Sequence, residues 1–242
     1  MKKSHYSFES SIEKSFWWFT VRRFFFSREI IKLINKNQKI LDIGSSSGTN
    51  LRMLEEIGYQ NYTGIDSSNE AIKLCKKKGF TNIIKGNVCK LPFKSNSIDL
   101  IIASDVLEHI ENDKLALSEI HRVMKKNAYA IITVPAFKFL WSLHDDNSMH
   151  KRRYIKKSLE DLINCKRFKI KKIFYFNFLL FLPIFLARIL FKFLKLKIKN
   201  ENKVNNKYLN VVLTIIFKFD VLIAEKMNPP FGVSIFSLIK KI

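Results

Sequence analysis

The sequence has 242 residues, of which 47% are hydrophobic and 22 are Phe, and its formal net charge is +22. This length and apolar content exclude a disordered chain and allow one domain of ordinary size with a substantial core. The three cysteines show no CxxC pair and no metal-ligand spacing, which predicts reduced thiols in a cytoplasmic protein. No apolar segment with a cleavage site follows the basic start, so we expect no secretion signal.

The positive charge is concentrated in the second half of the sequence. Residues 1–135 carry 21 Lys and Arg against 14 Asp and Glu, whereas residues 136–242 carry 22 against 7. Two interpretations are open: lysines spread over a solvated surface, or a C-terminal part that faces membrane headgroups, a phosphorylated substrate or nucleic acid.

Predicted strands and helices alternate between residues 39 and 135. Such alternation indicates βαβ units and a parallel sheet with helices on both faces. The predicted strands are KILDIGS (39–45), NYTGIDSS (61–68), TNIIKGNV (81–88), SIDLIIASD (97–105) and AYAIITVPA (128–136). The predicted helices are TNLRMLEEIG (49–58), NEAIKLCKKKG (69–79) and NDKLALSEIHRVMKKN (112–127).

The pattern changes after Pro135. A polar segment, WSLHDDNSMHKRRY (141–154), precedes a predicted short helix, KKSLEDLINC (156–165), and an apolar strand that begins at Lys169. A Phe-rich helical stretch runs from 178 to about 226 with a polar interruption, and FGVSIFSLIKK (231–241) is a predicted last strand.

The loop in DIGSSSG (42–48) joins the first strand to the first helix. It does not match the dinucleotide fingerprint G-x-G-x-x-G, because Ser46 takes the middle position and Thr49 the last, and it lacks the lysine of a P-loop. What it offers is an acid, Asp42, and two glycines, Gly44 and Gly48, that let the backbone approach a ligand. The acid suits a ligand with an ammonium group better than a phosphate.

This loop resembles the first motif, [DE]-x-G-x-G-x-G, of class I S-adenosylmethionine-dependent methyltransferases. YTGIDSS, KGNVCKLPFKSNSIDLIIASDVLEHI and EIHRVMKKNAYAIITVP resemble later segments of that family in order and spacing. FWWFTVRRFFFSREII, the stretch from VPAFKFLWSLHDD to HKRRY, and NPPFGVSIFSLIKK resemble a bacterial, type 11-like branch.

The resemblance implies a doubly wound, Rossmann-like α/β fold with a mostly parallel seven-stranded sheet, an antiparallel last strand and a helical insertion before it. It implies one domain, in which 1–38 is an N-terminal helical cap, 39–178 the sheet core and acceptor segment, 179–230 the insertion and 231–242 the last strand. It further implies in-line transfer of a methyl group from S-adenosylmethionine to a small-molecule, glycan or lipid-linked acceptor, with no metal.

The resemblance also assigns residues to the cofactor. Asp42 is expected to bind the methionine amino group, directly or through water, and Asp66 the ribose hydroxyls; for both, a helix cap is the alternative. Asn87 is expected at the adenine, with a turn residue as the alternative. The expected cofactor-binding set is Asp42, Gly44, Ser45, Gly48, Asp66, Ser67, Asn87, Val88 and Ser104.

Candidate catalytic residues follow the fourth strand and the fifth. Asp105 is expected to face the transferable methyl, and His109, four residues later, is a base, a substrate ligand or a structural hydrogen-bonding residue. His150 is a third candidate. The expected acceptor-binding residues are His144, Asp145, Arg152 and Arg153, and solvated charge is the alternative for the two arginines. The spacing H-D-D-x-x-x-H permits a metal, but nothing else in the segment completes a ligand set.

Two further expectations concern the ends of the chain. Trp17, Trp18 and Phe19 are expected on a helix that packs over the sheet and closes over the cofactor. The alternative is packing over the sheet edge alone, and a contact of Arg22 with the methionine carboxylate is not expected. Residues 171–226 are expected to lie on an anionic inner membrane surface without crossing it, because their uncharged run is too short to span. The cations of this segment are Arg188, Lys192, Lys195, Lys197 and Lys199; the alternative is a helical cap whose lysines face water.

Three other functions are alternatives: a dinucleotide-dependent oxidoreductase, a basic nucleic-acid-binding methyltransferase and a scaffold without activity. The missing dinucleotide fingerprint argues against the first. No N-P-P-[YF] motif follows the fourth strand, so nucleic acid is not the expected partner. The two acids Asp42 and Asp66 argue against the third.

Overall fold

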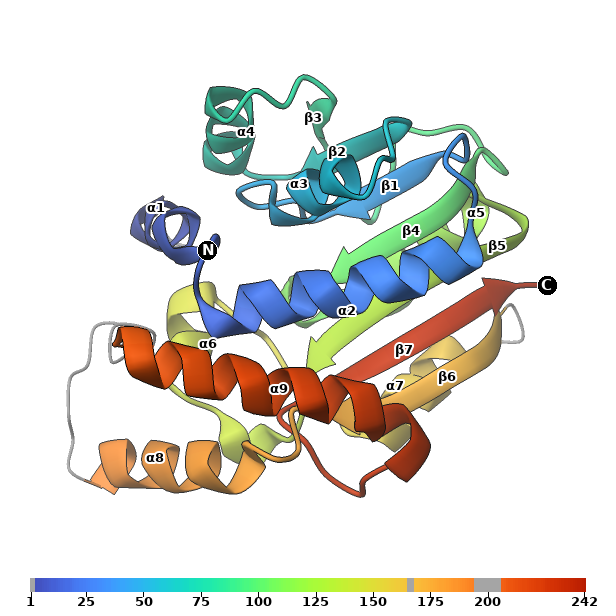
Figure 1. Cartoon of the computed structure of the whole chain (residues 1–242). Coiled ribbons are helices and arrows are strands. Elements are labelled where there is room, and N and C mark those ends of the chain that lie inside the picture. The colour runs from blue at the N-terminus through green and yellow to red at the C-terminus, as the bar shows by residue number, and fades with distance from the viewer. Residues whose placement is uncertain (1–2, 165–167, 194–205) are drawn as a thin grey trace.

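The structure is a computed structural model that describes residues 3–164, 168–193 and 206–242. A seven-stranded sheet with the order β3-β2-β1-β4-β5-β7-β6 forms its centre (Figure 1). β1 to β5 run parallel, and β7 is antiparallel to both of its neighbours, β5 and β6. The prediction of a doubly wound, mostly parallel sheet with an antiparallel last strand is therefore confirmed. The strands are β1 (Ile40–Ile43), β2 (Tyr62–Asp66), β3 (Ile83–Lys85), β4 (Ile98–Ser104), β5 (Met124–Pro135), β6 (Phe168–Phe176) and β7 (Ser234–Lys241).

Helices cover both faces of the sheet, because alternate residues of each central strand point to opposite sides. Ile40 of β1 belongs to the apolar cluster that contains α2, α3 and α9, whereas its neighbour Leu41 belongs to the cluster that contains α5 and α7. Figure 1 shows α2 and α9 side by side in front of the sheet. The helices are α1 (Lys3–Ile12), α2 (Trp17–Leu33), α3 (Thr49–Glu56), α4 (Asn69–Lys77), α5 (Asp113–Val123), α6 (Leu143–Ser148), α7 (Lys156–Ile163), α8 (Phe181–Phe193) and α9 (Lys207–Met227), with short 3-10 helices at Leu107–His109 and Lys138–Leu140.

The boundary between α5 and β5 differs from the prediction. The helix was expected to continue to Asn127, but it ends at Val123, and the strand begins at Met124. Met124 is fully buried and pairs with Ile98 of β4, ahead of an irregularity in the register. Strand pairing and burial outweigh the local helix propensity at this point.

Many of the phenylalanines pack where α2 and α9 meet the antiparallel strands. The rings of Phe25 on α2 and Phe236 on β7 lie 4.7 Å apart. Trp18 on α2 stacks on Phe217 of α9 at 5.1 Å and on Phe176 of β6 at 6.0 Å. These contacts between distant segments fix α2 and α9 against the sheet, next to the strand ends where a ligand would bind.

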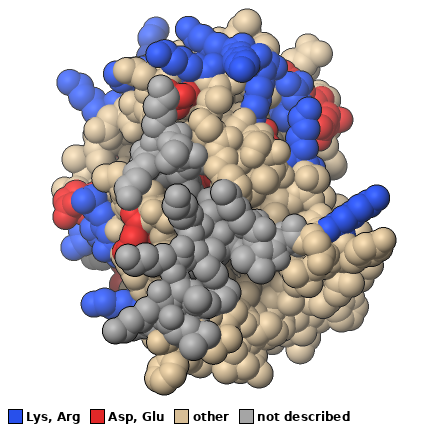
Figure 2. Space-filling model, turned by 90° about the vertical axis from the view of Figure 1, so that its left-hand side faces the viewer, with Lys and Arg blue, Asp and Glu red and all other residues tan. Residues whose placement is uncertain are grey.

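A largely apolar surface covers the outer sides of α8 and α9. In the view of Figure 2 the Lys and Arg side chains of the described residues gather toward the top and the left edge, and few of the described residues seen in the lower part are charged. Within the described ranges, no helix combines the length and the hydrophobicity that a membrane crossing requires. The large exposed apolar residues of these two helices include Leu182, Leu186, Leu190, Val211, Ile215 and Phe219.

Candidate functional site

A cavity of about 900 Å³ lies at the carboxyl ends of β1, β2 and β4, where the strand order reverses between β1 and β4, and extends to α2, α8 and α9. Open α/β sheets bind ligands at such a reversal. The volume is near the upper end of the roughly 300–1,000 Å³ common for small-molecule sites. We call the part at the strand ends the cofactor end and the part between α2, α8 and α9 the acceptor end.

The loop 44–48 depends on its two glycines. Gly44 and Gly48 have φ values of +71° and +86°, where side chains are rarely tolerated. A Cβ on Gly44 would lie 2.6 Å from Val106, and one on Gly48 would lie 2.6 Å from Phe80. Ser46, which replaces the family's middle glycine, also has a positive φ of +49°. The loop therefore has three residues in the left-handed region, and one of them carries a side chain.

Asp42 lies directly behind the lining of the cavity. It is fully buried, and its Oδ1 accepts a hydrogen bond of 2.8 Å from Asn50 Nδ2, while Asn50 itself lines the cavity. Its Oδ2 has no hydrogen-bond partner among the described residues. Burial raises the pKa of Asp42 to about 6. Asn50, which was not predicted, is thus the group that Asp42 orients toward a ligand.

Asp66 lines the cavity at the end of β2 and is held by backbone donors. One carboxylate oxygen accepts from Ser46 N at 3.0 Å and the other from Ser68 N at 2.8 Å. The N-cap of α4 is Ser68, whose side chain accepts from two backbone amides of the helix, so the alternative in which Asp66 caps this helix does not hold. Each oxygen retains a lone pair for a ligand hydroxyl.

The remaining predicted cofactor residues also line the cavity. Asn87 does so together with Val88, and its Oδ1 accepts from Cys89 N at 2.9 Å, which makes Asn87 a turn residue as well. Ser45, Ser67 and Ser104 complete this end of the cavity.

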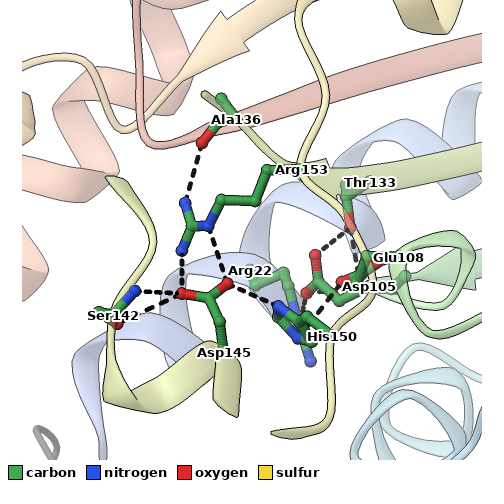
Figure 3. Close-up of polar contacts among 10 residues, drawn as sticks. Arg22, Asp105, Glu108, Thr133, Ala136, Ser142, Asp145, His150 and Arg153 are labelled. Atoms are coloured by element: carbon green, nitrogen blue, oxygen red, sulfur yellow. Dashed lines mark hydrogen bonds and ion pairs between the residues drawn. The ribbon is translucent and has the colours of Figure 1, made fainter. Parts of the chain in front are cut away.

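Asp105 follows β4 with a φ of +54° and is held from two sides (Figure 3). Arg22 of α2 donates to its Oδ2 at 2.6 Å, and Thr133 of β5 donates to its Oδ1 at 3.2 Å. The strained backbone and the two contacts fix the carboxylate at the cavity. The ion pair also ties α2 to the strand ends, a contact that the sequence did not predict for Arg22.

Glu108, His109 and His150, which we call the Glu-His cluster, line the cavity beside Asp105. Their ligand-type atoms all lie within 4.8 Å of one another, and the two imidazole rings are 4.6 Å apart. Burial raises the pKa of Glu108 well above its usual range, and the charge of Asp105 adds to this. Burial lowers the pKa of His109 to about 3, so that ring is neutral near pH 7.

Asp145 is fully buried and organises the segment after β5 (Figure 3). It accepts hydrogen bonds from Arg153 Nε at 2.8 Å, Arg153 Nη2 at 2.9 Å and Ser142 N at 2.8 Å, and lies 2.7 Å from His150 Nδ1. Burial alone would raise the pKa of Asp145, but the contacts with His150 and Arg153 hold it well below its usual range. Asp145 therefore positions its neighbours and does not line the cavity.

The other predicted acceptor residues separate into two groups. His144 and Arg153 line the cavity. Arg152 does not, because its guanidinium donates to Asp113 at 2.9 Å and to the Glu111 carbonyl at 2.8 Å.

The acceptor end is mainly apolar. Arg188 lies there too and donates to the Leu140 carbonyl at 2.6 Å, so it is not on the outer face where it was expected. Lys195, Lys197 and Lys199 fall outside the described residues, as does the side chain of Lys192. The apolar lining residues are Trp17, Trp18, Ile184, Ala187, Leu209 and Leu213.

Asn50, Glu108 and Arg188 are site residues that the prediction missed or misplaced. For Glu108 a signal was present, because an acid inside the apolar run DVLEHI is rarely buried without a function. For Asn50 and Arg188 the sequence carries no comparable signal.

Comparisons with known proteins agree with this geometry. A family model described as a methyltransferase domain matches residues 41–132. An uncharacterised protein from Methanocaldococcus jannaschii is 33% identical over 160 residues, which are 61% of this chain and 60% of that protein. The ubiquinone/menaquinone biosynthesis C-methyltransferase of Wigglesworthia glossinidia brevipalpis is 30% identical over 48% of this chain and 51% of its own length. The chain thus spans only about half to three fifths of these curated relatives.

Among solved structures, an S-adenosylmethionine-dependent methyltransferase from Archaeoglobus fulgidus superposes with a TM-score of 0.62. The two chains are 22% identical, and the match covers 98% of this chain and 99% of the other. At this identity the likeness establishes the fold.

Proposed function

We propose that this chain is a class I S-adenosylmethionine-dependent methyltransferase, because a methyltransferase-domain model matches residues 41–132, and that it transfers a methyl group from S-adenosylmethionine to a small, largely apolar acceptor. The observation that carries the proposal is the cavity, which joins the loop 44–48 and Asp66 at one end to apolar side chains of α2, α8 and α9 at the other. A methyl donor and its acceptor must meet in one such space.

The residues at the cofactor end fit S-adenosylmethionine. The backbone is bare at Gly44 and Gly48, where a Cβ would collide with Val106 or Phe80, and it can approach a ligand closely. When bound, this co-substrate supplies a methyl group on a positively charged sulfur. We assign Asn50, held by Asp42, to the methionine amino group, Asp66 and Ser67 to the ribose hydroxyls, and Asn87 and Val88 to the adenine.

The chemistry asks the chain mainly to position the acceptor. Ser104 and Asp105 lie where the two ends of the cavity meet, and Arg22 and Thr133 fix the carboxylate of Asp105. Holding two reactants in line supplies on the order of 7–11 kcal/mol of barrier reduction. We assign Asp105 to orienting the acceptor and the two histidines of the Glu-His cluster to contacting its reacting group.

The apolar acceptor end favours a hydrophobic or lipid-linked acceptor over a glycan. Trp17 and Trp18 offer large flat surfaces there, and Ile184 and Leu213 add aliphatic ones. The relative from Wigglesworthia is named for quinone biosynthesis, and quinone-type small molecules of that kind suit such a lining.

We extend the proposal to an anionic membrane surface as the place where the acceptor is met. Leu186 of α8 and Ile215 of α9 are 54% and 63% exposed, and both helices contribute residues to the acceptor end. A surface of this kind can dock in the headgroup region without crossing the bilayer.

Vesicle flotation tests the membrane contact. The protein should float with anionic but not with neutral vesicles, and Leu186→Glu combined with Ile215→Glu should abolish flotation. Leu115→Glu on α5, at a residue 45% exposed on the other face, is the matched control and should float as the wild type does. Flotation of all three proteins, or of none, contradicts the docking surface.

Incubation with radiolabelled S-adenosylmethionine tests the reaction. Separate organic-soluble and aqueous fractions of a bacterial extract serve as acceptor sources. Label should enter the organic-soluble fraction and should require Asp66. Transfer only to the aqueous fraction would refute the apolar acceptor, and no binding of S-adenosylhomocysteine would refute the methyltransferase assignment itself.

A further inference from the structure

Glu108 presents a chemical problem that the methyl transfer does not explain. Its side chain is fully buried, and neither carboxylate oxygen has a hydrogen-bond partner among the described residues. His150 Nε2 lies 3.9 Å from Oε1, beyond hydrogen-bonding distance. A buried carboxylate normally has hydrogen bonds, an ion pair or a metal, because desolvation of its charge is costly.

The two histidines beside it are each held by a second partner. Nδ1 of His150 lies 2.7 Å from Asp145, which leaves Nε2 on the side of Glu108 (Figure 3). The ring of His109 hydrogen-bonds the backbone of Met149. A histidine that ligates a metal almost always donates its other ring N–H to a carboxylate or a carbonyl, and the cluster has one of each.

The backbone supports the same juxtaposition. Lys151 N donates to the Glu108 carbonyl at 2.7 Å, which joins the segment after β4 to the segment after α6. Asp145 in turn is fixed by Arg153 and Ser142. The three side chains therefore converge on the cavity from two segments that are locked together.

We propose that Glu108, His109 and His150 form a binding site for a divalent transition-metal ion, whose open position faces the cavity and binds an oxygen of the methyl acceptor. Two imidazoles and one carboxylate are the donor set of His₂Glu zinc sites and of non-haem iron sites, and they favour zinc, manganese or iron over magnesium or calcium. No metal was expected from the sequence, because the spacing from His144 to His150 completes no ligand set and the approach of His150 to Glu108 arises only in the folded chain.

The spacing of the cluster is compatible with this assignment. Ligands at about 2.1 Å from a tetrahedral ion lie about 3.4 Å apart. The ligand atoms of the cluster lie within 4.8 Å, so binding requires them to draw together by about an ångström. The carboxylate of Glu108 can rotate toward the two rings, since no hydrogen bond from the described residues restrains it.

The metal site also narrows the chemical class of the methyl acceptor. This step rests on the proposed function. A hydroxyl or phenol oxygen bound to such an ion loses its proton far more readily than in water. The proton leaves to solvent, and the oxygen remains on the ion as an anion. We therefore infer an acceptor that presents a hydroxyl, such as a phenol or a hydroquinone.

Metal titration of the chelator-treated protein tests the site without any turnover. Co²⁺, followed by its visible absorption, and Zn²⁺, followed by calorimetry, should bind at one ion per chain. Glu108→Gln, which nearly preserves shape, should weaken binding at least 100-fold, and Asp145→Asn about 10–100-fold through the orientation of His150. His121→Gln, at a histidine of α5 outside the cluster, is the control and should bind as the wild type does.

The open position is tested with 4-nitrocatechol as the hydroxyl probe. Its absorption should shift on binding to the metal-loaded wild type and not to metal-treated Glu108→Gln. Thermal melting in chelator shows whether each variant is folded, and His150→Ala provides a second variant of the ligand set. No metal binding by the wild type, or equal binding by Glu108→Gln and His150→Ala, overturns the site. An unshifted probe on metal-loaded wild type overturns its open position.

Calorimetry with S-adenosylhomocysteine on the same samples separates the two proposals. Binding of S-adenosylhomocysteine without metal binding leaves the methyltransferase assignment in place and removes the metal site. Metal binding without S-adenosylhomocysteine binding does the reverse.

Discussion

The two ends of the cavity are built in different ways. At the cofactor end, the groups come mainly from turns after β1, β2, β3 and β4, and backbone amides hold the key carboxylate of Asp66. At the acceptor end, the lining comes from α2, α8 and α9, which are far apart in the sequence. Side-chain contacts hold this end and the adjoining segment after β5 in place, as in the contact of Trp18 with Phe217 and of Arg153 with Asp145. A group held by backbone amides, which we call a backbone framework, keeps its position when neighbouring side chains are substituted. Segments held by side-chain contacts, which we call a side-chain framework, depend on single residues.

The largest effect is expected at the acceptor end, where two adjacent arginines differ in their surroundings. Arg153 is almost fully buried with Asp145, whereas Arg152 is about one-third exposed in its pair with Asp113. Arg153→Ala should lower the free energy of unfolding by about 3–5 kcal/mol, because it leaves a buried charge unpaired. Arg152→Ala should cost about 1 kcal/mol or less. Urea denaturation measures both, and equal losses would contradict the side-chain framework.

A second effect, of about 3 kcal/mol, is expected in the pH dependence of stability. Asp220 of α9 is fully buried and accepts from Asn177 N at 2.6 Å and Leu179 N at 2.8 Å. Burial raises the pKa of Asp220 from 3.8 to about 6. The folded state thus holds the proton more tightly than the unfolded state, and this contribution is present below about pH 4 and lost as the pH rises to 6.

Asp220→Asn should remove this dependence. The stability of the wild type minus that of Asp220→Asn should fall between pH 4 and pH 7. Asp99 provides the contrast, because its lysine contacts keep its pKa low despite partial burial. The stability of the wild type minus that of Asp99→Asn should therefore fall as the pH decreases. A pH-independent difference for Asp220→Asn would show that its carboxylate is not desolvated.

At the cofactor end, Asp66→Ala should act on binding rather than on folding. Loss of hydrogen bonds to a charged group should weaken S-adenosylhomocysteine binding by about 1.5–3 kcal/mol, or roughly 10–150-fold. Calorimetry measures this, with Asp161→Ala, at an aspartate 59% exposed on α7, as the control. Unchanged affinity in a folded Asp66→Ala protein would remove Asp66 from the cofactor site.

The smallest effect is a gain of stability. Ser46 has a positive φ, and its buried hydroxyl has no hydrogen-bond partner among the described residues, so Ser46→Gly should raise the free energy of unfolding by about 0.5–1 kcal/mol. The neighbouring Ser47→Gly should lower it by about 1 kcal/mol, because the Ser47 hydroxyl donates to Glu13. Thermal melts of the two variants should shift in opposite directions, and a loss in Ser46→Gly would show that the loop is not strained.

The difference between the two ends also explains what the sequence could predict. The alternation of strands and helices, the loop 44–48 and the position of Asp66 follow from local patterns: apolar runs, glycines and acids at strand ends. The end of α5 at Val123 does not, because it depends on pairing of Met124 with a strand that lies earlier in the chain.

At the acceptor end, the same limit applies to side chains. Nothing near Arg188 in the sequence indicates that its guanidinium reaches Leu140, and nothing near His150 indicates that it meets Glu108. The adjacent Arg152 and Arg153 look alike in the sequence, and only the fold separates a surface pair from a buried one. The cofactor and substrate roles assigned from the resemblance stay predictions until they are tested.

The position of β7 between β5 and β6 has a consequence for synthesis of the chain. β6 is joined to the sheet only through β7, and Ser234 of β7 follows Phe176 of β6 by 58 residues. At about 5–20 residues per second, a ribosome needs on the order of 3–12 s to bridge that distance. During this interval β6 has been made but lacks its partner strand, and α8 and α9 are added while β6 is not yet joined to the sheet. The nascent chain is therefore most exposed to aggregation, and to capture by chaperones, just before its last strand appears.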